Sequence, residues 1–114
     1  VIILVPNYKS TMRVLSANWP WWMVDDHHFH FSRTSIKRIL SQTGFRLRYL
    51  ESFEDGTDFW LSLNGNFARV KPVLARKLIK ALILPLIYVI YLALRPLLWK
   101  LYNGGLLLAI AQKK

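Results

Sequence analysis

The feature that most constrains the fold of this chain is a helical pattern that ends at a glycine and passes directly into a strand pattern. Ser32 or Thr34 can cap the N-terminus of the helix by accepting a bond from a free backbone N–H. One face of the helix then carries Ile36, Ile39, Leu40 and Thr43. Gly44 suits the positive φ that ends many helices. We therefore expect a helix from about residue 33 that ends before Gly44.

Two kinds of strand pattern flank this helix. Residues 45–51 alternate, with Phe45, Leu47 and Tyr49 on one face and Arg46 and Arg48 on the other. Arginines along one side suit a sheet edge, where charge discourages unwanted pairing. Residues 1–5 are uniformly apolar and stop at Pro6-Asn7, which is typical of a strand buried on both faces of a parallel sheet. A third strand, also apolar, is expected over 106–111.

The remaining segments complete an α/β chain with one partial domain. Residues 7–31 lack periodicity and predict a long loop, and residues 54–66 predict a turn-rich connection. The organisation we expect is a strand–loop–helix–strand unit at 1–52, a helical insertion at 53–102 and a final strand at 103–114. Val1 opens the sequence inside an apolar strand with no signal-peptide pattern, so we expect a piece of a longer polypeptide.

The insertion contains a long helical stretch that begins near Pro72. Its unbroken apolar run, 81–94, is shorter than the roughly 20 residues that a membrane span needs. Pro85 and Pro96 predict a kinked helix or a broken hairpin. One narrow face carries the residues that we expect to meet water or lipid headgroups: Lys77, Lys80, Tyr88, Tyr91, Arg95 and Trp99. We expect the leucines to pack on the sheet or dip into lipid.

Composition narrows the class of protein. The chain has 114 residues, enough for one modest core, and no cysteine, which excludes disulfides and thiolate metal sites. The net charge of +10 indicates an anionic partner or surface, or serves only to keep an apolar protein soluble. A membrane surface suits the 54% hydrophobic content better than nucleic acid does, since no nucleic-acid recognition motif is present.

An ordered set of motifs resembles the C-terminal half of class I S-adenosylmethionine-dependent methyltransferases, in the small-molecule branch. The set comprises a strand ending in Pro6-Asn7, a Trp-rich irregular segment, Asp26-His27, His30, Phe31-Ser32, Gly44-Phe45 and a final Gly105–Lys113 tail. The resemblance implies a Rossmann-like sheet in which 1–5, 45–51 and 106–111 are strands 5, 6 and 7. Strand 7 would lie between the other two and run antiparallel.

The same resemblance implies a function and a cofactor. The chain would be the acceptor-side portion of a methyltransferase that acts on a hydrophobic small molecule or lipid. We expect a cytoplasmic location, with residues 72–101 as the part that would contact a membrane surface peripherally. The family holds S-adenosylmethionine through a Gly-rich turn after the first strand and an acidic residue after the second. Neither is present in these 114 residues, so the cofactor site and the N-terminal half of the enzyme are expected upstream.

The histidine cluster allows three interpretations. A metal site from Asp25, Asp26, His27, His28 and His30 is chemically possible, but consecutive residues rarely converge on one ion. His27 or His30 can instead act as a catalytic base in the acceptor pocket, because imidazole titrates near neutral pH. The third interpretation is that the segment only positions the loop against the helix that follows. We assign no metal.

Four further residues are candidates for binding the acceptor: Asn7, Tyr8, Trp19 and Trp22. Asn7 and Tyr8 follow a central strand, where α/β sheets bind ligands, although Pro-Asn is also ordinary turn chemistry. The alternative to an enzyme is a non-enzymatic, basic membrane-surface module built on residues 72–101. Against that alternative, such a module needs no sheet.

Overall fold

The structure is a computed structural model that describes residues 1–23 and 25–114; Val24, inside the segment 7–31, lies outside the described residues. The chain is mixed α/β. Its strands are β1 (Ile2–Pro6), β2 (Phe45–Phe53) and β3 (Leu106–Lys113). Its α-helices are α1 (Thr11–Leu15), α2 (Arg33–Gln42), α3 (Asp58–Asn64) and α4 (Val73–Lys100), and two 3₁₀ turns span Pro20–Trp22 and Gly65–Phe67.

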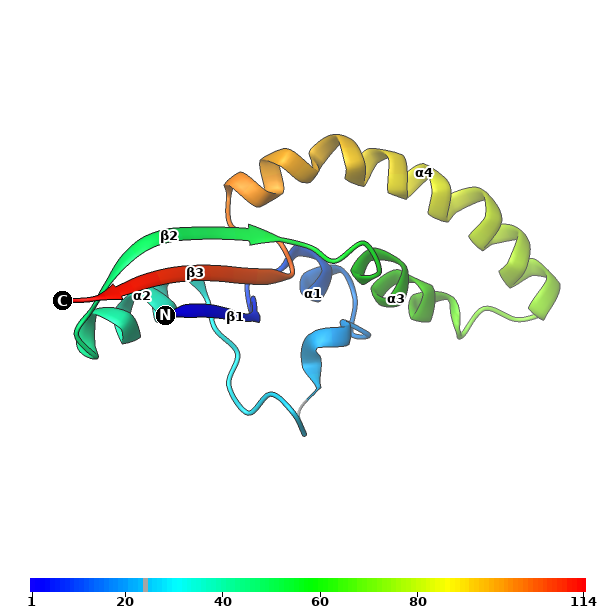
Figure 1. The fold of residues 1–114 in the computed structure, drawn as a ribbon. Coiled ribbons are helices and arrows are strands. Elements are labelled where there is room, and N and C mark those ends of the chain that lie inside the picture. Colours follow the sequence, from blue (N-terminus) through cyan, green and yellow to red (C-terminus); the bar gives the residue numbers. More distant parts are fainter. Residues whose placement is uncertain (24) are drawn as a thin grey trace.

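The three strands form one sheet in the order β1-β3-β2, and β3 runs antiparallel to both neighbours. The predicted strand order, with 106–111 between the other two, is confirmed. Helix α2 covers one face of this sheet, where Ile36 and Leu40 pack against Ala109 and Ala111 (Figure 1). The cap is also confirmed, because the Ser32 side chain accepts a bond from the Ser35 backbone N–H at 3.2 Å.

Two predictions about the sheet are wrong. Strand β1 is not buried on both faces of a parallel sheet: it pairs antiparallel with β3, and Ile2 and Leu4 are 72% and 56% exposed. The reason is that alternate side chains face opposite ways, and α2 covers one of the two faces. Tyr49 does not share a face with Leu47, because the register shifts between them and Leu50 takes the inward position instead.

Two segments expected to be loops contain helices. Within 7–31, Ser10 caps the five-residue α1, its hydroxyl accepting a bond from the Met12 N–H at 3.2 Å. Within 54–66, α3 buries Phe59 and Leu63. Both helices are short, and they are stabilised by a shared core with α4 rather than by their own sequence pattern.

Helix α4 is continuous through Pro85 and Pro96 and curves gradually, so the broken hairpin is not found (Figure 1). Its 28 residues correspond to about 42 Å at 1.5 Å per residue. By length and composition alone, α4 is able to cross a membrane. The prediction that this region is too short to span a membrane counted only the uncharged run 81–94. The helix extends beyond that run on both sides, so the prediction is wrong on length.

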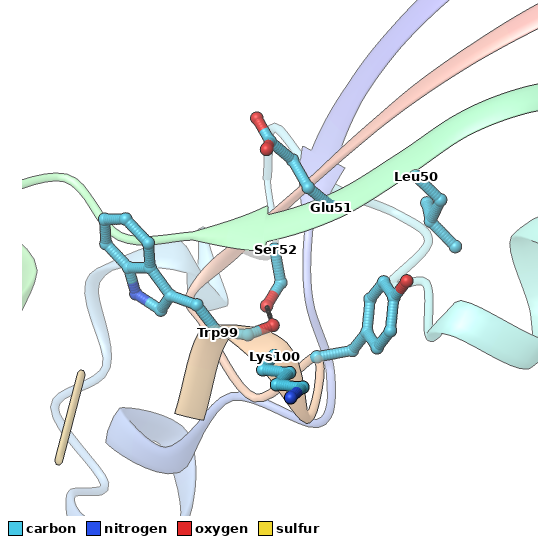
Figure 2. Close-up of a pocket in the computed structure, with 6 residues that line it drawn as sticks. Leu50, Glu51, Ser52, Trp99 and Lys100 are labelled. Atoms are coloured by element: carbon cyan, nitrogen blue, oxygen red, sulfur yellow. Dashed lines mark hydrogen bonds between the residues drawn. The ribbon is translucent and has the colours of Figure 1, made fainter. Parts of the chain in front are cut away.

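The C-terminal end of α4 is fixed to the end of β2. The Ser52 hydroxyl donates to the Trp99 carbonyl oxygen at 3.1 Å and accepts from the Gly104 N–H at 3.1 Å. Figure 2 shows Ser52 directed at the Trp99 backbone, whereas the Glu51 side chain points away from Lys100. This junction lines a hollow of about 280 Å³ and closes the turn that leads from α4 into β3.

Candidate functional site

The carboxyl end of β1 is anchored by Asn7, which is completely buried. Its side-chain amide donates to the carbonyl oxygens of Tyr102 and Gly104 at 2.8 and 2.7 Å, and its Oδ1 accepts from the Lys9 N–H at 3.1 Å. Every polar atom of the side chain therefore has a partner within the protein. Of the predicted acceptor-binding residues, Asn7 is the one whose polar groups are already used by the fold.

Tyr8 begins an aromatic cluster over this end of the sheet. Its backbone N–H donates to the Phe31 carbonyl oxygen at 2.7 Å, which ties the segment before α2 to the end of β1. Its ring is exposed, with the Arg13 guanidinium 4.1 Å from the ring centroid and Trp22 at 6.3 Å edge-on. The predicted residues Tyr8 and Trp22 are therefore brought together, with an arginine that the sequence did not single out.

His30 belongs to the same cluster. Its ring lies 5.3 Å from Trp22 and 6.0 Å from Trp19, and its Nε2 is 3.0 Å from the Trp21 carbonyl oxygen. Because a carbonyl oxygen only accepts, Nε2 carries the hydrogen, and in the neutral ring Nδ1 is the basic nitrogen. The half-buried His30 is thus oriented by the backbone with one nitrogen left for a proton.

Trp19 and His27 are placed differently from each other. Trp19 is 2% exposed and belongs to the hydrophobic core, so it supports Trp22 and His30 from beneath and offers no surface to a ligand. His27 packs near Trp21, with ring centroids 6.3 Å apart, and faces a separate hollow of about 260 Å³ beside Leu4 and Pro6. Among residues 1–23 and 25–114, no three histidine or acidic side chains are grouped to hold a metal ion.

A pair of acidic residues that the sequence reading passed over lies beneath the end of β2. Asp58 is 1% exposed, and both its carboxylate oxygens accept from the Trp21 indole N–H, at 2.9 and 3.0 Å. Glu54, in the connection that follows β2, buries both carboxylate oxygens without a hydrogen-bond partner in the described structure. The Trp99 indole N–H is buried nearby, but it does not make a bond of acceptable geometry to Glu54.

Burial governs the ionisation of both acids. Loss of hydration and, to a smaller extent, the neighbouring Asp58 raise the pKa of Glu54 from its ordinary value of 4.5 to about 7, against the opposing effects of Arg95 and Trp99. Burial likewise raises the pKa of Asp58, although the bond from Trp21 favours the charged form. Glu54 therefore responds to pH in the neutral range and adjoins α4 through Trp99 and Arg95.

The stripe predicted on α4 faces largely inward. Tyr91 is buried and stacks on Phe59 at 5.1 Å, and Tyr88 packs on the same ring at 5.0 Å. Lys80 donates to the Asn64 side-chain oxygen at 2.6 Å, and the Arg95 guanidinium lies 4.8 Å from the centroid of the half-buried Trp99 ring. Lys77 is exposed.

The outward face of α4 is instead aliphatic. Of the two alternatives expected for its leucines, packing on the sheet is not found for this face, and contact with lipid stays a prediction. Aromatic rings bury more area than leucines do, so the aromatic side of α4 packs against the core formed by α1 and α3. Exposed apolar residues run along the whole helix: Leu74, Leu78, Leu82, Leu86, Val89, Ile90, Leu94 and Leu97.

Comparisons of the chain with protein-family profiles, with curated proteins and with solved structures found no match.

The functional candidates that sequence reasoning missed are Arg13, Glu54 and Asp58. The acidic pair had a usable signal, because the two carboxylates stand close in sequence to Phe59, an aromatic residue that a core would bury. The polar and glycine content of residues 54–66 obscured that signal. Arg13 had none, since its contact with Tyr8 depends on α1 folding back over the end of β1.

Proposed function

We propose that this chain forms the acceptor side of an S-adenosylmethionine-dependent methyltransferase. The observation that carries the proposal is the sheet, in which β3 lies between β1 and β2 and runs antiparallel to both. That arrangement is the one expected for the last three strands of the methyltransferase family that the motifs resemble. A Rossmann-like sheet that continues beyond β1 is part of this proposal and is supported by the position of β1 at the end of the described sheet, where its other edge is open to a further strand.

The described residues do not themselves fit S-adenosylmethionine. No Gly-rich turn follows a strand in them, and the buried amide at the end of β1 is fully bonded to the backbone of the turn before β3. Residues outside this chain would hold the cofactor. When bound there, the cofactor would supply a methyl group attached to a positively charged sulfur. What this chain would contribute is the position of the acceptor, and correct positioning is a large part of catalysis for such a transfer.

Tyr8, Trp22 and His30 are the residues we assign to the acceptor. The two aromatic rings meet edge-on and offer an angled apolar surface, and Arg13 over Tyr8 adds a positive charge at its border. His30 Nδ1 would accept the proton that the nucleophilic atom of the acceptor loses, since Nε2–H is held by the Trp21 carbonyl oxygen. The acceptor we propose is a hydrophobic small molecule or lipid.

The place of action we propose is the membrane surface, with the protein on the cytoplasmic side. Helix α4 contains no acidic residue, carries five Lys or Arg residues by the sequence and exposes its aliphatic face. This combination suits an anionic leaflet. Its inward face is packed on α3 through Tyr91 and Phe59, so α4 lies along the protein and would meet the bilayer sideways. A non-enzymatic membrane-surface module is the second candidate, favoured by this same face.

The test is methyl transfer by the intact polypeptide as the cell makes it. With S-adenosylmethionine labelled in the methyl group, we expect label to enter a lipid or hydrophobic small-molecule fraction. His30→Gln keeps an N–H for the Trp21 carbonyl oxygen but lacks a basic nitrogen, so the proposal expects kcat to fall roughly 100-fold or more with the fold retained. His28→Gln, at an exposed neighbour, is the matched control.

The two candidates separate cleanly. Absence of S-adenosylmethionine binding and of methyl transfer in the intact polypeptide, together with retained vesicle binding, would leave the membrane-surface module. Equal kcat for His30→Gln and parent would remove His30 as the base without touching the rest of the proposal.

A further inference from the structure

Helices α1 and α4 do not close completely over the core that they share with α3. Between them lies an apolar groove of about 160 Å³. Met12 of α1 and Phe59 of α3 form its floor, and both are almost completely buried. A dry apolar cavity of about 150 Å³ is large enough to take a benzene-sized molecule, so this groove has room for roughly six carbon atoms.

The rim of the groove is apolar and open to the outside. Leu15 of α1 is 53% exposed, and Ile90 and Leu94 of α4 are 52% and 48% exposed. Ile90 and Leu94 also belong to the outward aliphatic face of α4. The groove is therefore an inward extension of that face rather than an isolated internal void.

Charge decides which occupant suits this opening. The chain carries a net charge of +10, and α4 has Lys and Arg residues toward both ends and no acid. A second copy of the same chain would meet like charge along the helix, whereas anionic headgroups would be attracted to it. A bilayer also presents flexible hydrocarbon chains at the depth that an interfacial helix reaches, about 5–10 Å.

We propose that the groove between α1 and α4 takes up the end of one acyl chain of a lipid from an anionic bilayer. This inference rests on the membrane association in the proposed function and adds a specific binding site to it. Uptake would bury the acyl chain against Met12 and Phe59, in the same hydrophobic core against which Trp22 packs. The site thus links lipid contact to the acceptor cluster through one packed layer of side chains.

The experiment uses the intact polypeptide on vesicles of phosphatidylcholine and phosphatidylglycerol. The phosphatidylcholine carries a photoreactive diazirine at the end of one acyl chain, and adducts are located by peptide mass spectrometry. We expect adducts at Met12, Leu15 or Phe59 in addition to the outer face of α4. Ile90→Trp fills the rim, and Val89→Trp makes a larger side-chain change at a neighbouring position that does not line the groove.

Ile90→Trp should lower the yield of groove adducts roughly tenfold, the effect of denying burial to about two methylene groups, and Val89→Trp should leave it unchanged. Both variants should still bind the vesicles. Leu94→Trp, also on the rim, serves as the second variant if Ile90→Trp does not fold.

Adducts confined to the outer face, with vesicle binding intact, would overturn the groove and leave membrane association standing. No vesicle binding at all would overturn both. Groove adducts that are undiminished in both rim variants would overturn the site. A protein dimer that the rim substitutions dissociate would also overturn it, because the occupant of the groove would then be a second copy of the polypeptide.

Discussion

Glu54 should make the protein less stable as the pH rises toward neutral. Both carboxylate oxygens are buried without a hydrogen-bond partner in the described structure, and burial raises the pKa to about 7 from an ordinary value of 4.5. The folded state therefore holds its proton more tightly than the unfolded state does. Between about pH 4.5 and 7 the folded protein binds more protons, so the free energy of unfolding falls as the pH rises through this window.

The magnitude follows from the shift. At about 1.4 kcal/mol per pKa unit, the full shift corresponds to about 3 kcal/mol. Glu54 as a whole residue is half-buried, and screening by the nearby solvent lowers this figure, so we expect about 1–2 kcal/mol. Glu54→Gln keeps the shape and removes the titration. Relative to the parent, this variant should gain about 1–2 kcal/mol between pH 4.5 and pH 8.

The assay is chemical denaturation followed by circular dichroism at the two pH values, with a double difference between variant and parent. Glu51→Gln removes a carboxylate from β2, close to Glu54 in the sequence, and is the control, with no such gain expected. A double difference for Glu54→Gln near zero would refute the reasoning, since it would mean that the buried carboxylate is hydrated or paired in solution.

Three further predictions concern the fold and the membrane. Asn7→Ala removes two buried hydrogen bonds and leaves two carbonyl oxygens without donors, so it should cost about 2–4 kcal/mol in urea unfolding, whereas exposed Lys9→Ala should cost almost nothing. Gly104→Ala would place a Cβ 2.7 Å from the Phe53 backbone nitrogen and should lower stability by at least about 2 kcal/mol, while Gly56→Ala, which meets open space, should not. In sedimentation with anionic vesicles, Lys77→Gln and Lys100→Gln, at exposed positions of α4, should each weaken binding by about 1 kcal/mol. Lys37→Gln, at an exposed position of α2, should not weaken it.

Local chemistry accounts for the parts of the fold that were predictable. The Ser32 cap and the positive φ of Gly44, +80°, are decided by residues within one helical turn, and both are found as expected. The strand order was predictable because it came from an ordered set of motifs. Periodicity alone gave a different and wrong detail, since it assigned Tyr49 to the inner face and missed the register shift beside it.

The parts that were not predictable depend on contacts between distant segments. Helices α1 and α3 have five and seven residues, too few for a periodic signal, and they form because Met12 and Phe59 meet in a core with Tyr91 of α4. The direction of α4 has the same origin. Its aromatic and aliphatic sides both qualify as an apolar face, and only the presence of Phe59 decides which one turns inward.

One anchor connects the proposed acceptor site to the proposed membrane contact. Asn7 ends β1 and bonds the carbonyl oxygens of Tyr102 and Gly104, which belong to the turn between α4 and β3. Tyr8, the next residue, begins the aromatic cluster. A helix that rests on a bilayer would therefore hold the cluster at a fixed orientation to the lipid surface, because only one buried side chain separates the two. It follows that Asn7→Ala should disturb the acceptor site and the angle of α4 together, whereas substitutions on the outward face of α4 should affect lipid contact alone.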